Sequence, residues 1–309
     1  MSKILIIGSS NTDLIARVKR FATAGETVEG SFFMQAMGGK GANQAVAAHK
    51  LGGEVQFVTS LGKDSNGEYT LNYFKDMGLN VSSSQIVENV PSGTAMIWVD
   101  DNGENCIVIT PGANNELKPD YIDKIYQDIA NSDIIVMQME IPYETVKRVC
   151  EVANSLSKKV ILNVAPARKL ERDLISKIDI LVVNETEAET ISGTTIDEVG
   201  EMMIIEKIRD LGAKTVLLTL GKKGSILKNG TTSLTIPAFN VNTVDSTAAG
   251  DTFCGALAAE LSRNKSWQES LTFASAAAAI CVTKMGAQPS IPDEAEVREF
   301  LHKFEVNKG

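Results

Sequence analysis

The sequence is poor in histidine, and this limits the chemistry open to it. Its 309 residues include only two histidines, His49 and His302. Histidine-rich metal sites and most Ser-His or Cys-His catalytic arrangements therefore have almost nothing to draw on. The four cysteines lie far apart in the sequence and form no CxxC pair: Cys106, Cys150, Cys254 and Cys281. We expect neither a zinc cluster nor a disulfide framework, and a cytoplasmic location fits this cysteine usage.

Basic residues and long apolar runs are scarce as well. The chain has 30 Lys and Arg against 39 Asp and Glu, a formal net charge of −9, and no basic tail or stripe of the kind that follows a phosphate backbone. The apolar run in MSKILIIG is too short for a signal peptide or a membrane span, and it predicts a β-strand instead. We therefore expect neither nucleic acid nor a membrane as a partner.

What the sequence does contain is a regular alternation of helical and strand patterns from about residue 118 onward. The apolar runs are continuous, which is typical of strands buried on both faces of a parallel sheet. They lie at 133–138, 159–164, 179–184 and 214–220. Two Ala-rich stretches, 250–263 and 267–284, predict helices that pack closely. We predict a single doubly wound α/β domain over residues 1–309, with a mainly parallel sheet flanked by helices.

Two stretches break this alternation, residues 12–37 and 85–110. The second contains GTAMIWVDDNGENCIVI, which predicts two strands joined by an Asp-Asn-Gly turn. Such strands have no helical partner, so we predict a small β-sheet beside the main sheet. It would cover a ligand as a lid, or pair with a second copy of the chain to form a homodimer and hide exposed strand edges.

Polar residues directly follow several of the predicted strands. They are Asn11 to Asp13, Glu140, Asn184 to Glu187, and Thr219 to Gly221. In a doubly wound domain, ligands bind beyond the carboxyl ends of the strands. We therefore expect these residues at one edge of the sheet, around a binding site.

The glycine-rich run from Gly38 to Asn43 precedes a predicted helix. Its glycines would let a ligand approach the backbone, while Lys40 and Asn43 offer hydrogen-bond donors. The run fits neither the Walker A pattern nor the dinucleotide pattern GxGxxG. Taken alone, it is equally compatible with a glycine turn that starts a tightly packed helix.

A second run, from Asp245 to Asp251, leads small residues directly into a predicted helix. The first amides of a helix have no partner inside it, so the backbone N–H groups of Ala249, Gly250 and Asp251 predict an anion hole for a transferred phosphoryl group. Asp251 would lie within reach of an incoming hydroxyl, as the base that takes its proton. The alternative is that Asp251 only caps the helix.

Together these motifs resemble those of the ribokinases, within the carbohydrate kinase family also called the PfkB family. The resemblance extends over essentially the whole chain. It rests on NTD at 11–13, GGKGANQA at 38–45, MQME at 137–140, NETEAE at 184–189, TLGKKG at 219–224, DSTAAGDTF at 245–253 and KMGAQPSIP at 284–292. It implies a ribokinase-like fold and the phosphorylation of the 5-hydroxyl of D-ribose by ATP.

The resemblance also assigns roles to individual residues. Asp251 would be the base, and the turn at Ala248, Ala249 and Gly250 would be the anion hole. The sugar would be held by Asn11, Asp13, Gly39, Lys40, Asn43, Glu140 and Asp251. The nucleotide would be lined by Asn184, Thr219, Gly221, Gly224, Gly250 and Ser275.

Two cations follow from the resemblance. Asn184 and Glu187 would organise Mg²⁺ near the phosphates, partly through water; judged alone, Glu187 fits a solvated helix face equally well. A monovalent cation, typically K⁺, would lie in a loop and bind mostly backbone carbonyls. This loop comprises Asp245, Thr247, Cys281, Lys284, Gly286 and Ser290, with Lys284 contributing its carbonyl because an ammonium group cannot ligate a cation.

Two positions depart from the family pattern. Cys254 stands where ribokinases commonly have asparagine, and Ser275 replaces a larger polar residue often found near the nucleotide base. Neither is the proposed base, so the expected activity class is unchanged. Cys254 is either an inert packed thiol or a thiol whose oxidation would block phosphate binding.

The identity of the sugar stays open. A pocket that separates ribose from 2-deoxyribose depends on one hydroxyl contact, and a ketohexose or the ribose of a nucleoside is a further alternative. An alternative of another class is a catalytically inactive sugar or nucleotide sensor, although the presence of Asp251, Asn184 and Glu187 argues against it. A purely structural protein would make the polar residues at so many strand ends accidental.

Overall fold

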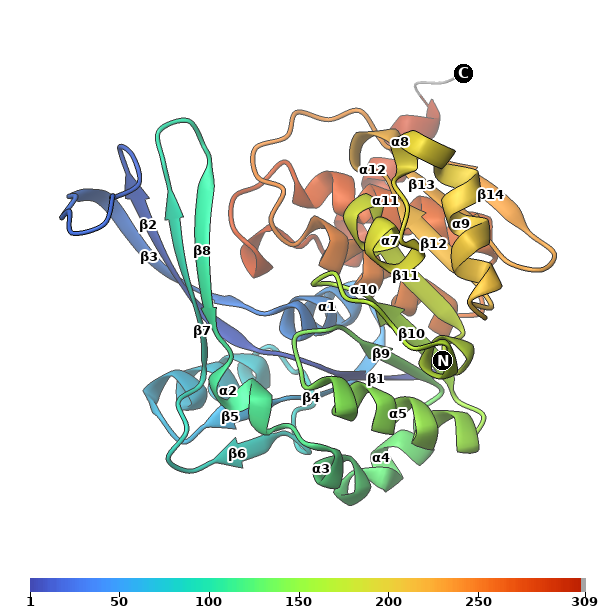
Figure 1. Cartoon of the computed structure of the whole chain (residues 1–309), viewed down its shortest axis with the longest axis horizontal. Coiled ribbons are helices and arrows are strands. Elements are labelled where there is room, and N and C mark those ends of the chain that lie inside the picture. The colour runs from blue at the N-terminus through green and yellow to red at the C-terminus, as the bar shows by residue number, and fades with distance from the viewer. Residues whose placement is uncertain (307–309) are drawn as a thin grey trace.

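The main body of the protein is an eight-stranded sheet, seen in a computed structural model that describes residues 1–306 (Figure 1). The strand order is β14-β13-β12-β11-β10-β9-β1-β4. The strands are β1 (Lys3–Ile7), β4 (Glu54–Val58), β9 (Ile134–Met137), β10 (Lys159–Asn163), β11 (Ile180–Asn184), β12 (Val216–Thr219), β13 (Ser225–Lys228) and β14 (Ser233–Ile236). Neighbours from β4 to β12 pair in parallel, while β13 and β14 extend one edge antiparallel. The predicted mainly parallel sheet is confirmed.

Helices cover both faces of this sheet, which is why its strands are apolar throughout. In β1, Ile4 and Ile6 enter one core while Leu5 and Ile7 enter the other, because successive side chains of a strand point to opposite faces. The first core is covered by α1 (Lys40–Lys50), α2 (Ser65–Asp76), α10 (Ala249–Ser262), α11 (Trp267–Cys281) and α12 (Glu294–Val306). The second is covered by α3 (Pro119–Lys124), α4 (Tyr126–Ala130), α5 (Tyr143–Ser155), α6 (Arg172–Ser176), α7 (Glu185–Ser192), α8 (Ile196–Val199) and α9 (Glu201–Asp210).

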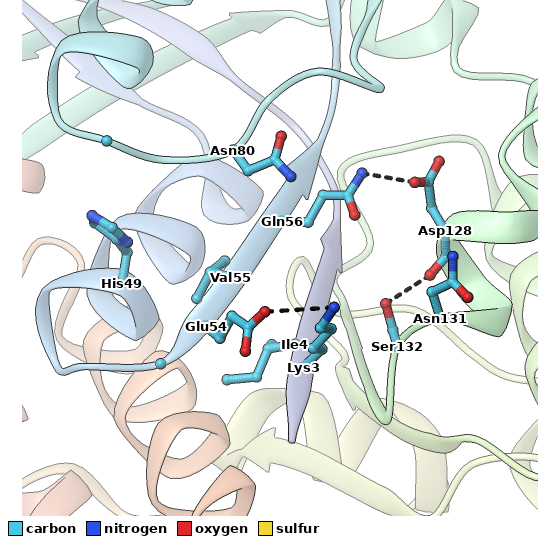
Figure 2. A pocket seen from close by; sticks show the side chains of 12 residues that line it. Lys3, Ile4, His49, Glu54, Val55, Gln56, Asn80, Asp128, Asn131 and Ser132 are labelled. Carbon is cyan, nitrogen blue, oxygen red and sulfur yellow. Dashed lines mark hydrogen bonds and ion pairs between the residues drawn. The ribbon is translucent and has the colours of Figure 1, made fainter. Parts of the chain in front are cut away.

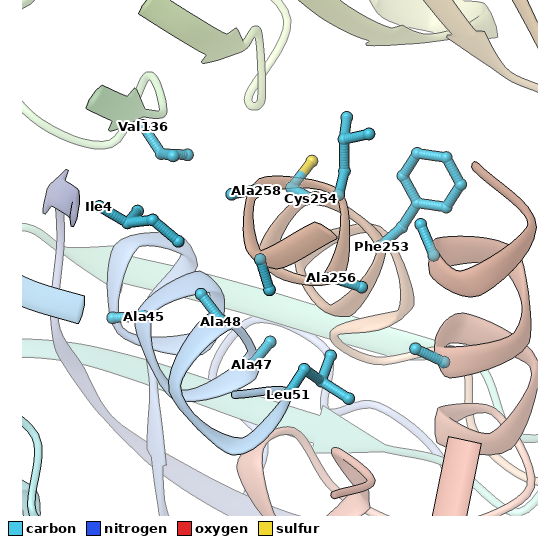
Figure 3. Packing of buried hydrophobic residues seen from close by; sticks show 14 of the residues in the cluster. Ile4, Ala45, Ala47, Ala48, Leu51, Val136, Phe253, Cys254, Ala256 and Ala258 are labelled. Atoms are coloured by element: carbon cyan, nitrogen blue, oxygen red, sulfur yellow. The ribbon is translucent and has the colours of Figure 1, made fainter. Parts of the chain in front are cut away.

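Small residues bring α1 and α10 together, as Figure 3 shows. Ala47 and Ala48 of α1 lie among the buried residues that meet Ala256 and Ala258 of α10. At Gly255 a Cβ atom would come within 2.6 Å of the Ala47 side chain, so only glycine allows this approach. The predicted close packing of the two Ala-rich helices is confirmed by the contacts between α10 and α11. The approach of α1 to α10 sets the amino-terminal turns of these two helices side by side.

A second sheet of four strands projects from the main body beside the amino-terminal end of α1 (Figure 1). Its order is β3-β2-β7-β8, made of β2 (Asn11–Val18), β3 (Gly30–Gly38), β7 (Gly93–Val99) and β8 (Asn105–Thr110). β2 pairs antiparallel with β3 and parallel with β7, and β7 pairs antiparallel with β8. We call this sheet the lid.

The stretch 85–110 does not belong to the lid in full. Its first strand, β6 (Gln85–Val87), pairs in parallel with β5 (Ser60–Gly62) as a separate two-stranded sheet. The N–H of Gln85 donates to the carbonyl of Thr59 at 2.8 Å, which holds β6 against the chain that leaves β4. Turns of 3₁₀ type lie at Gly112–Glu116, Gly221–Lys223 and Gln288–Ser290. Within residues 1–306, no helix combines the length and the hydropathy needed to cross a membrane.

Candidate active site

The polar residues predicted to follow the strands lie at the carboxyl edge of the parallel sheet. Asn184 ends β11 and is paired with Thr219, which ends β12. Glu140 follows β9, and Asn11 begins β2 shortly after β1. The parallel register therefore gathers at one edge residues that are far apart in the sequence.

Asp251 lies in the first turn of α10, and only 7% of its surface is exposed. Its Oδ2 accepts a hydrogen bond from Asn43 Nδ2 at 3.0 Å, and its Oδ1 accepts one from Gln44 Nε2 at 3.0 Å. Among the described residues, no side chain caps the start of α10, so the alternative that Asp251 is only a helix cap is wrong. Burial raises the pKa of Asp251, while the positive charge of Lys40 and the two donors oppose that rise.

The amino terminus of α10 offers free backbone donors beside Asp251. Ala248 adopts the left-handed conformation, with φ of 60°, which is uncommon outside glycine and turns the chain sharply into the helix. Within residues 1–306, the N–H groups of Gly250 and Asp251 have no hydrogen-bond acceptor. Ala249 differs from the prediction, because its N–H donates to the carbonyl of Ser246 at 3.3 Å across the tight turn. The available anion hole therefore centres on Gly250 and Asp251.

Three buried carboxamides stand behind Asp251. Gln44 Nε2 donates to Asn163 Oδ1 at 3.2 Å as well as to Asp251, and Gln44 Oε1 accepts from Gln138 Nε2 at 2.7 Å. Asn163 ends β10 and Gln138 follows β9, so this network is rooted in the main sheet. The sequence prediction missed all three as site residues, although each occupies the same kind of position as residues that it did select: Gln44 lies beside Asn43, and the other two lie near the ends of apolar runs.

Asp13 lies on β2 at the base of the lid and is 8% exposed. A Cβ atom at Gly38, on the neighbouring β3, would come within 2.1 Å of Asp13 Oδ2, so glycine leaves the space that the carboxylate occupies. Burial, and then the negative charge of Glu140, raises the pKa of Asp13 to about 7. An acid that titrates near neutrality in a buried polar site is a candidate for function.

Asn11, also predicted to hold the sugar, has a structural partner. Its Oδ1 accepts from Asn114 Nδ2 at 2.8 Å, and Asn114 Oδ1 in turn accepts from the backbone N–H of Ser10 at 2.9 Å. Asn114 is 2% exposed and lies just after the lid strands, where the sequence showed no motif. These bonds tie the base of the lid to the main body and leave the Nδ2 group of Asn11 for a ligand.

The run from Gly38 to Asn43 forms a glycine turn at the start of α1, and its contact with a ligand stays a prediction. Gly39 has φ of 89°, and a Cβ atom there would come within 2.8 Å of the backbone nitrogen of Asn11, so this glycine is required by the turn itself. The N–H of Lys40 donates to Glu140 Oε2 at 2.9 Å. Burial lowers the pKa of the Lys40 ammonium, but the charges of Asp251, Glu140 and Glu187 outweigh this and raise it. Lys40 therefore stays cationic among carboxylates.

Asn184 and Glu187 form a capping box at the start of α7. The backbone N–H of Asn184 donates to Glu187 Oε2 at 2.8 Å, and the N–H of Glu187 donates to Asn184 Oδ1 at 2.9 Å. Glu187 is 5% exposed, so the interpretation as a solvated helix face is wrong. Burial raises its pKa. Its carboxylate is held by these bonds and lies close enough to Lys40 and Asp251 to feel their charges.

A cavity of about 720 Å³ opens between β11, β12 and the starts of α7 and α10. Its lining includes Asn184, Thr219, Gly221, Gly224, Gly250 and Ser275, all six residues predicted to line a nucleotide. Phe239 and Phe253 add apolar surface. The volume suits a nucleotide-sized ligand, and the free donor of Gly250 belongs to the same lining.

The residues of the predicted cation loop lie together beyond the turn that leads into α10. Asp245 Oδ1 accepts from the N–H of Thr247 at 2.9 Å, and its Oδ2 accepts from the N–H of Gly286 at 2.9 Å, which joins the two halves of the loop. Cys281 Sγ lies 3.0 Å from Ser290 Oγ. The ammonium of Lys284 pairs with Glu296 at 2.8 Å, and the role of its carbonyl as a cation ligand stays a prediction.

Cys254 is 1% exposed and lies on α10 among the buried residues of the first core, with its sulfur pointing away from α1 (Figure 3). Burial raises the pKa of its thiol well above the usual range, and the carboxylates of Asp251 and Glu187 add to this effect. A thiol that stays protonated is a poor nucleophile. The structure thus favours the inert packed cysteine over the oxidation-sensitive one.

A second cavity, of about 420 Å³, lies at the opposite edge of the sheet, at the amino ends of β1 and β4 (Figure 2). Several of its polar groups pair with one another. Gln56 Nε2 donates to Asp128 Oδ1 at 2.9 Å, and Lys3 pairs with Glu54 at 3.6 Å. Among the described residues that line this cavity, no buried side-chain atom lacks a hydrogen-bond partner. This edge therefore carries none of the features gathered around Asp251.

The chain is similar to known carbohydrate kinases over almost its whole length. Residues 1–294 match the model of the pfkB family carbohydrate kinases. The ribokinase of Haemophilus influenzae is 41% identical over 299 residues, which cover 96% of this chain and 98% of the relative. The deoxyribokinase of Salmonella typhi is 35% identical over 300 residues, which cover 96% of this chain and 98% of the relative.

Among solved structures, the chain is similar to the Arabidopsis thaliana ribokinase complexed with ribose and ATP. The TM-score is 0.92 at 34% sequence identity, over 97% of this chain and 98% of that structure. The similarity covers the lid as well as the main sheet, because almost the whole length of both chains is matched.

Proposed function

Because the chain belongs to the pfkB family of carbohydrate kinases, we propose that it transfers the terminal phosphoryl group of ATP to the 5-hydroxyl of D-ribose and so forms ribose 5-phosphate. The observation that carries this proposal is the placement of Asp251. A buried carboxylate lies beside unpaired helix-start amides, with a nucleotide-sized cavity adjoining the helix start and the polar residues of the lid base on the side of α1. Relatives named ribokinase, one of them solved in complex with ribose and ATP, support ribose as the acceptor.

The sugar would lie between the base of the lid and the start of α1. Asp13, Glu140 and Asn43 supply carboxylates and a carboxamide that accept from or donate to paired hydroxyls. Asn43 Oδ1 is buried without a partner among the described residues, which leaves an acceptor for a sugar hydroxyl. Burying these groups costs stability unless a ligand pairs with them, which is what a polar substrate does.

In the reaction, Asp251 orients the 5-hydroxyl and takes its proton as the oxygen bonds to the terminal phosphorus. The bond between that phosphorus and the bridging oxygen of ADP breaks, and ADP leaves. The N–H groups of Gly250 and Asp251 receive the charge on the transferred group, and the positive end of α10 supports them. Lys40 keeps a positive charge near Asp251, which helps this buried acid remain ionised as a base must.

Two cations complete the proposal. The carboxylate and carboxamide oxygens of Glu187 and Asn184 suit Mg²⁺, but their mutual hydrogen bonds indicate contact through water. Bound Mg²⁺ would neutralise phosphate charge. The loop of Asp245, Thr247, Cys281, Lys284, Gly286 and Ser290 has the oxygen-rich composition that suits K⁺, and bound K⁺ would order the turn into α10.

The lid supports a homodimer as a further part of the proposal. Its edge strand β8 is exposed along its whole length, and Ile107, Val108 and Ile109 are each about half exposed. An exposed apolar edge strand is a surface that proteins usually cover. Pairing of two lids would cover it; sedimentation at micromolar concentration that shows only monomer would remove this part. A cytoplasmic location stays a prediction of the sequence.

The test is an assay of ADP release by the purified chain with a panel of sugars, with and without K⁺. We expect the highest kcat/KM with D-ribose and a rise in rate with K⁺. 2-Deoxyribose is the specific rival, since the Salmonella typhi relative is a deoxyribokinase. A higher kcat/KM for 2-deoxyribose, a ketohexose or a nucleoside would replace ribose, whereas calorimetric binding of ribose and ATP without ADP release would indicate a sensor.

A further inference from the structure

Gln44 is completely buried, yet it is one of only two side chains that donate to the carboxylate of Asp251 among the described residues. Its partner in this task, Asn43, lies at the start of α1 where a sugar is expected. Gln44 points the other way, toward the sheet, and contacts Asn163 and Gln138. It therefore has no evident contact with a ligand.

The direction of the Gln44 carboxamide is decided by its neighbours. Gln138 donates to Gln44 Oε1 at 2.7 Å, which leaves both hydrogens of Gln44 Nε2 for two acceptors, Asn163 Oδ1 and Asp251 Oδ1. A carboxylate only accepts hydrogen bonds, so the opposite orientation would set the Gln44 oxygen against the Asp251 oxygen. The three polar partners of Gln44 thus agree on a single arrangement.

The far side of the network reaches the main sheet. Gln138 is fully buried, and a Cβ atom at Gly8 would come within 2.0 Å of Gln138 Oε1, so glycine at this position makes room for the carboxamide. Asn163 Nδ2 lies 3.4 Å from the carbonyl of Val182 on the next strand. The rigid centre of the sheet is therefore linked through two carboxamides to Gln44.

We propose that Gln44 is a positioning residue for the phosphoryl transfer: through its single fixed orientation it holds Asp251 Oδ1 toward the sheet, so that the remaining lone pairs of the carboxylate face the acceptor hydroxyl. This inference rests on the proposed function. Gln44 touches no reacting atom and acts through Asp251. Its second effect is electrostatic, because a donor to a carboxylate favours the ionised form that a base requires.

The test compares Gln44→Met with the parent protein. Methionine keeps the length and volume of glutamine and removes the donor. We expect kcat to fall by about tenfold to a hundredfold, the range for losing a hydrogen bond to a charged group, while KM for sugar and ATP changes by less than about threefold. The acidic limb of the kcat profile should move to higher pH, because the pKa of Asp251 rises further when a donor is lost.

Other charged and titratable groups face Asp251 and are unchanged in this variant. They are Lys40 from α1, Glu140 after β9, Glu187 from α7, Cys254 on α10 itself and Cys281 from α11. A displacement of the acidic limb in Gln44→Met is therefore attributable to the lost donor.

Gln56→Met is the matched control, since Gln56 also donates through Nε2 to an aspartate Oδ1 but at the opposite edge of the sheet. It should leave kcat and the pH profile in place. If Gln44→Met does not fold, Gln138→Met removes only the group that orients Gln44, and kcat should fall and the acidic limb move in the same direction to a smaller extent.

If Gln44 has only a structural role, Gln44→Met will lower the Tm but will have the same kcat and the same pH profile as the parent protein. That result would overturn the inference. An equal shift in Gln56→Met would overturn it as well. Lack of any sugar-dependent ADP release in the parent protein would instead refute the proposed function, so the two failures are distinguishable.

Discussion

Two cavities lie at opposite edges of the same sheet, and both are lined by polar and charged side chains. At the amino edge, Gln56 pairs with Asp128 and Lys3 pairs with Glu54, so these polar groups of the cavity in Figure 2 are paired without a ligand. At the carboxyl edge, Asp251 and Asp13 are buried with raised pKa values, and the amides of Gly250 and Asp251 have no acceptor among the described residues. The candidate site is therefore distinguished by its unsatisfied polar groups, because both edges of the sheet have a cavity.

The largest difference between the two edges is expected at the two aspartates that accept a hydrogen bond from a glutamine. We expect Asp251→Asn to lower kcat by about a thousandfold or more, since the base is removed, while calorimetry still detects sugar binding. Asp128→Asn, its counterpart at the amino edge, should leave kcat unchanged. Near-parental turnover in Asp251→Asn would refute the role of the base.

The free amides of α10 give the next largest effect. Gly250→Pro removes one N–H in the first turn of a helix, where proline is usually tolerated. Apart from its chain neighbours and the nearby backbone of α10, no atom of residues 1–306 lies within 4 Å of a Cβ atom built on Gly250. We expect kcat to fall by about a hundredfold, the cost of losing one donor to a developing charge.

The matched control for the amide is Gly250→Ala, which keeps the N–H. It should retain kcat within about threefold in the same steady-state assay. Equal losses in the two variants would show that the site tolerates no side chain there and would remove the argument for the amide.

Asp13, at the carboxyl edge, should make the stability of the protein depend on pH. Its folded pKa of about 7 lies above the ordinary value of 3.8, so the folded chain binds more protons than the unfolded chain across this window. The contribution of Asp13 to stability is therefore fully present below about pH 4 and is lost as the pH rises toward 7. Asp13→Asn removes this loss.

We expect Asp13→Asn to be more stable than the parent protein at pH 8 by about 1–3 kcal/mol and to lose that advantage near pH 4, as measured by urea unfolding. Sugar affinity should fall by about tenfold or more in the same variant. A stability difference that is independent of pH would contradict the raised pKa.

The smallest expected effect lies at the amino edge. Gln56→Met removes two hydrogen bonds, to Asp128 and to Ser83, in a half-buried position. The free energy of unfolding should fall by about 1 kcal/mol, with kcat and KM unchanged. A tenfold change in kcat would show that this cavity is coupled to the site and would end the contrast between the two edges.

The sequence alone was enough to predict the parallel strands β1 and β9 to β12, most of the lid and the helix start that carries Asp251. Continuous apolar runs occur where both faces of a sheet are covered, and polar residues at the ends of those runs must meet at one edge, which is why Asp13, Glu140 and Asn184 could be selected. The small residues before Asp251 likewise identified a helix start. These are local features, because each is visible in the order of neighbouring residues along the chain.

Tertiary structure alone decided how those residues are used. Gln44, Gln138 and Asn163 were not selected from the sequence as site residues, and they form a network only because α1 packs against α10 and brings Gln44 beside the ends of β9 and β10. The pairing of β6 with β5, the burial of Glu187 and the engagement of the Ala249 amide depend in the same way on contacts across the fold. Hydrogen-bond partners and desolvation are set by neighbours in space, and the order of residues along the chain does not contain them.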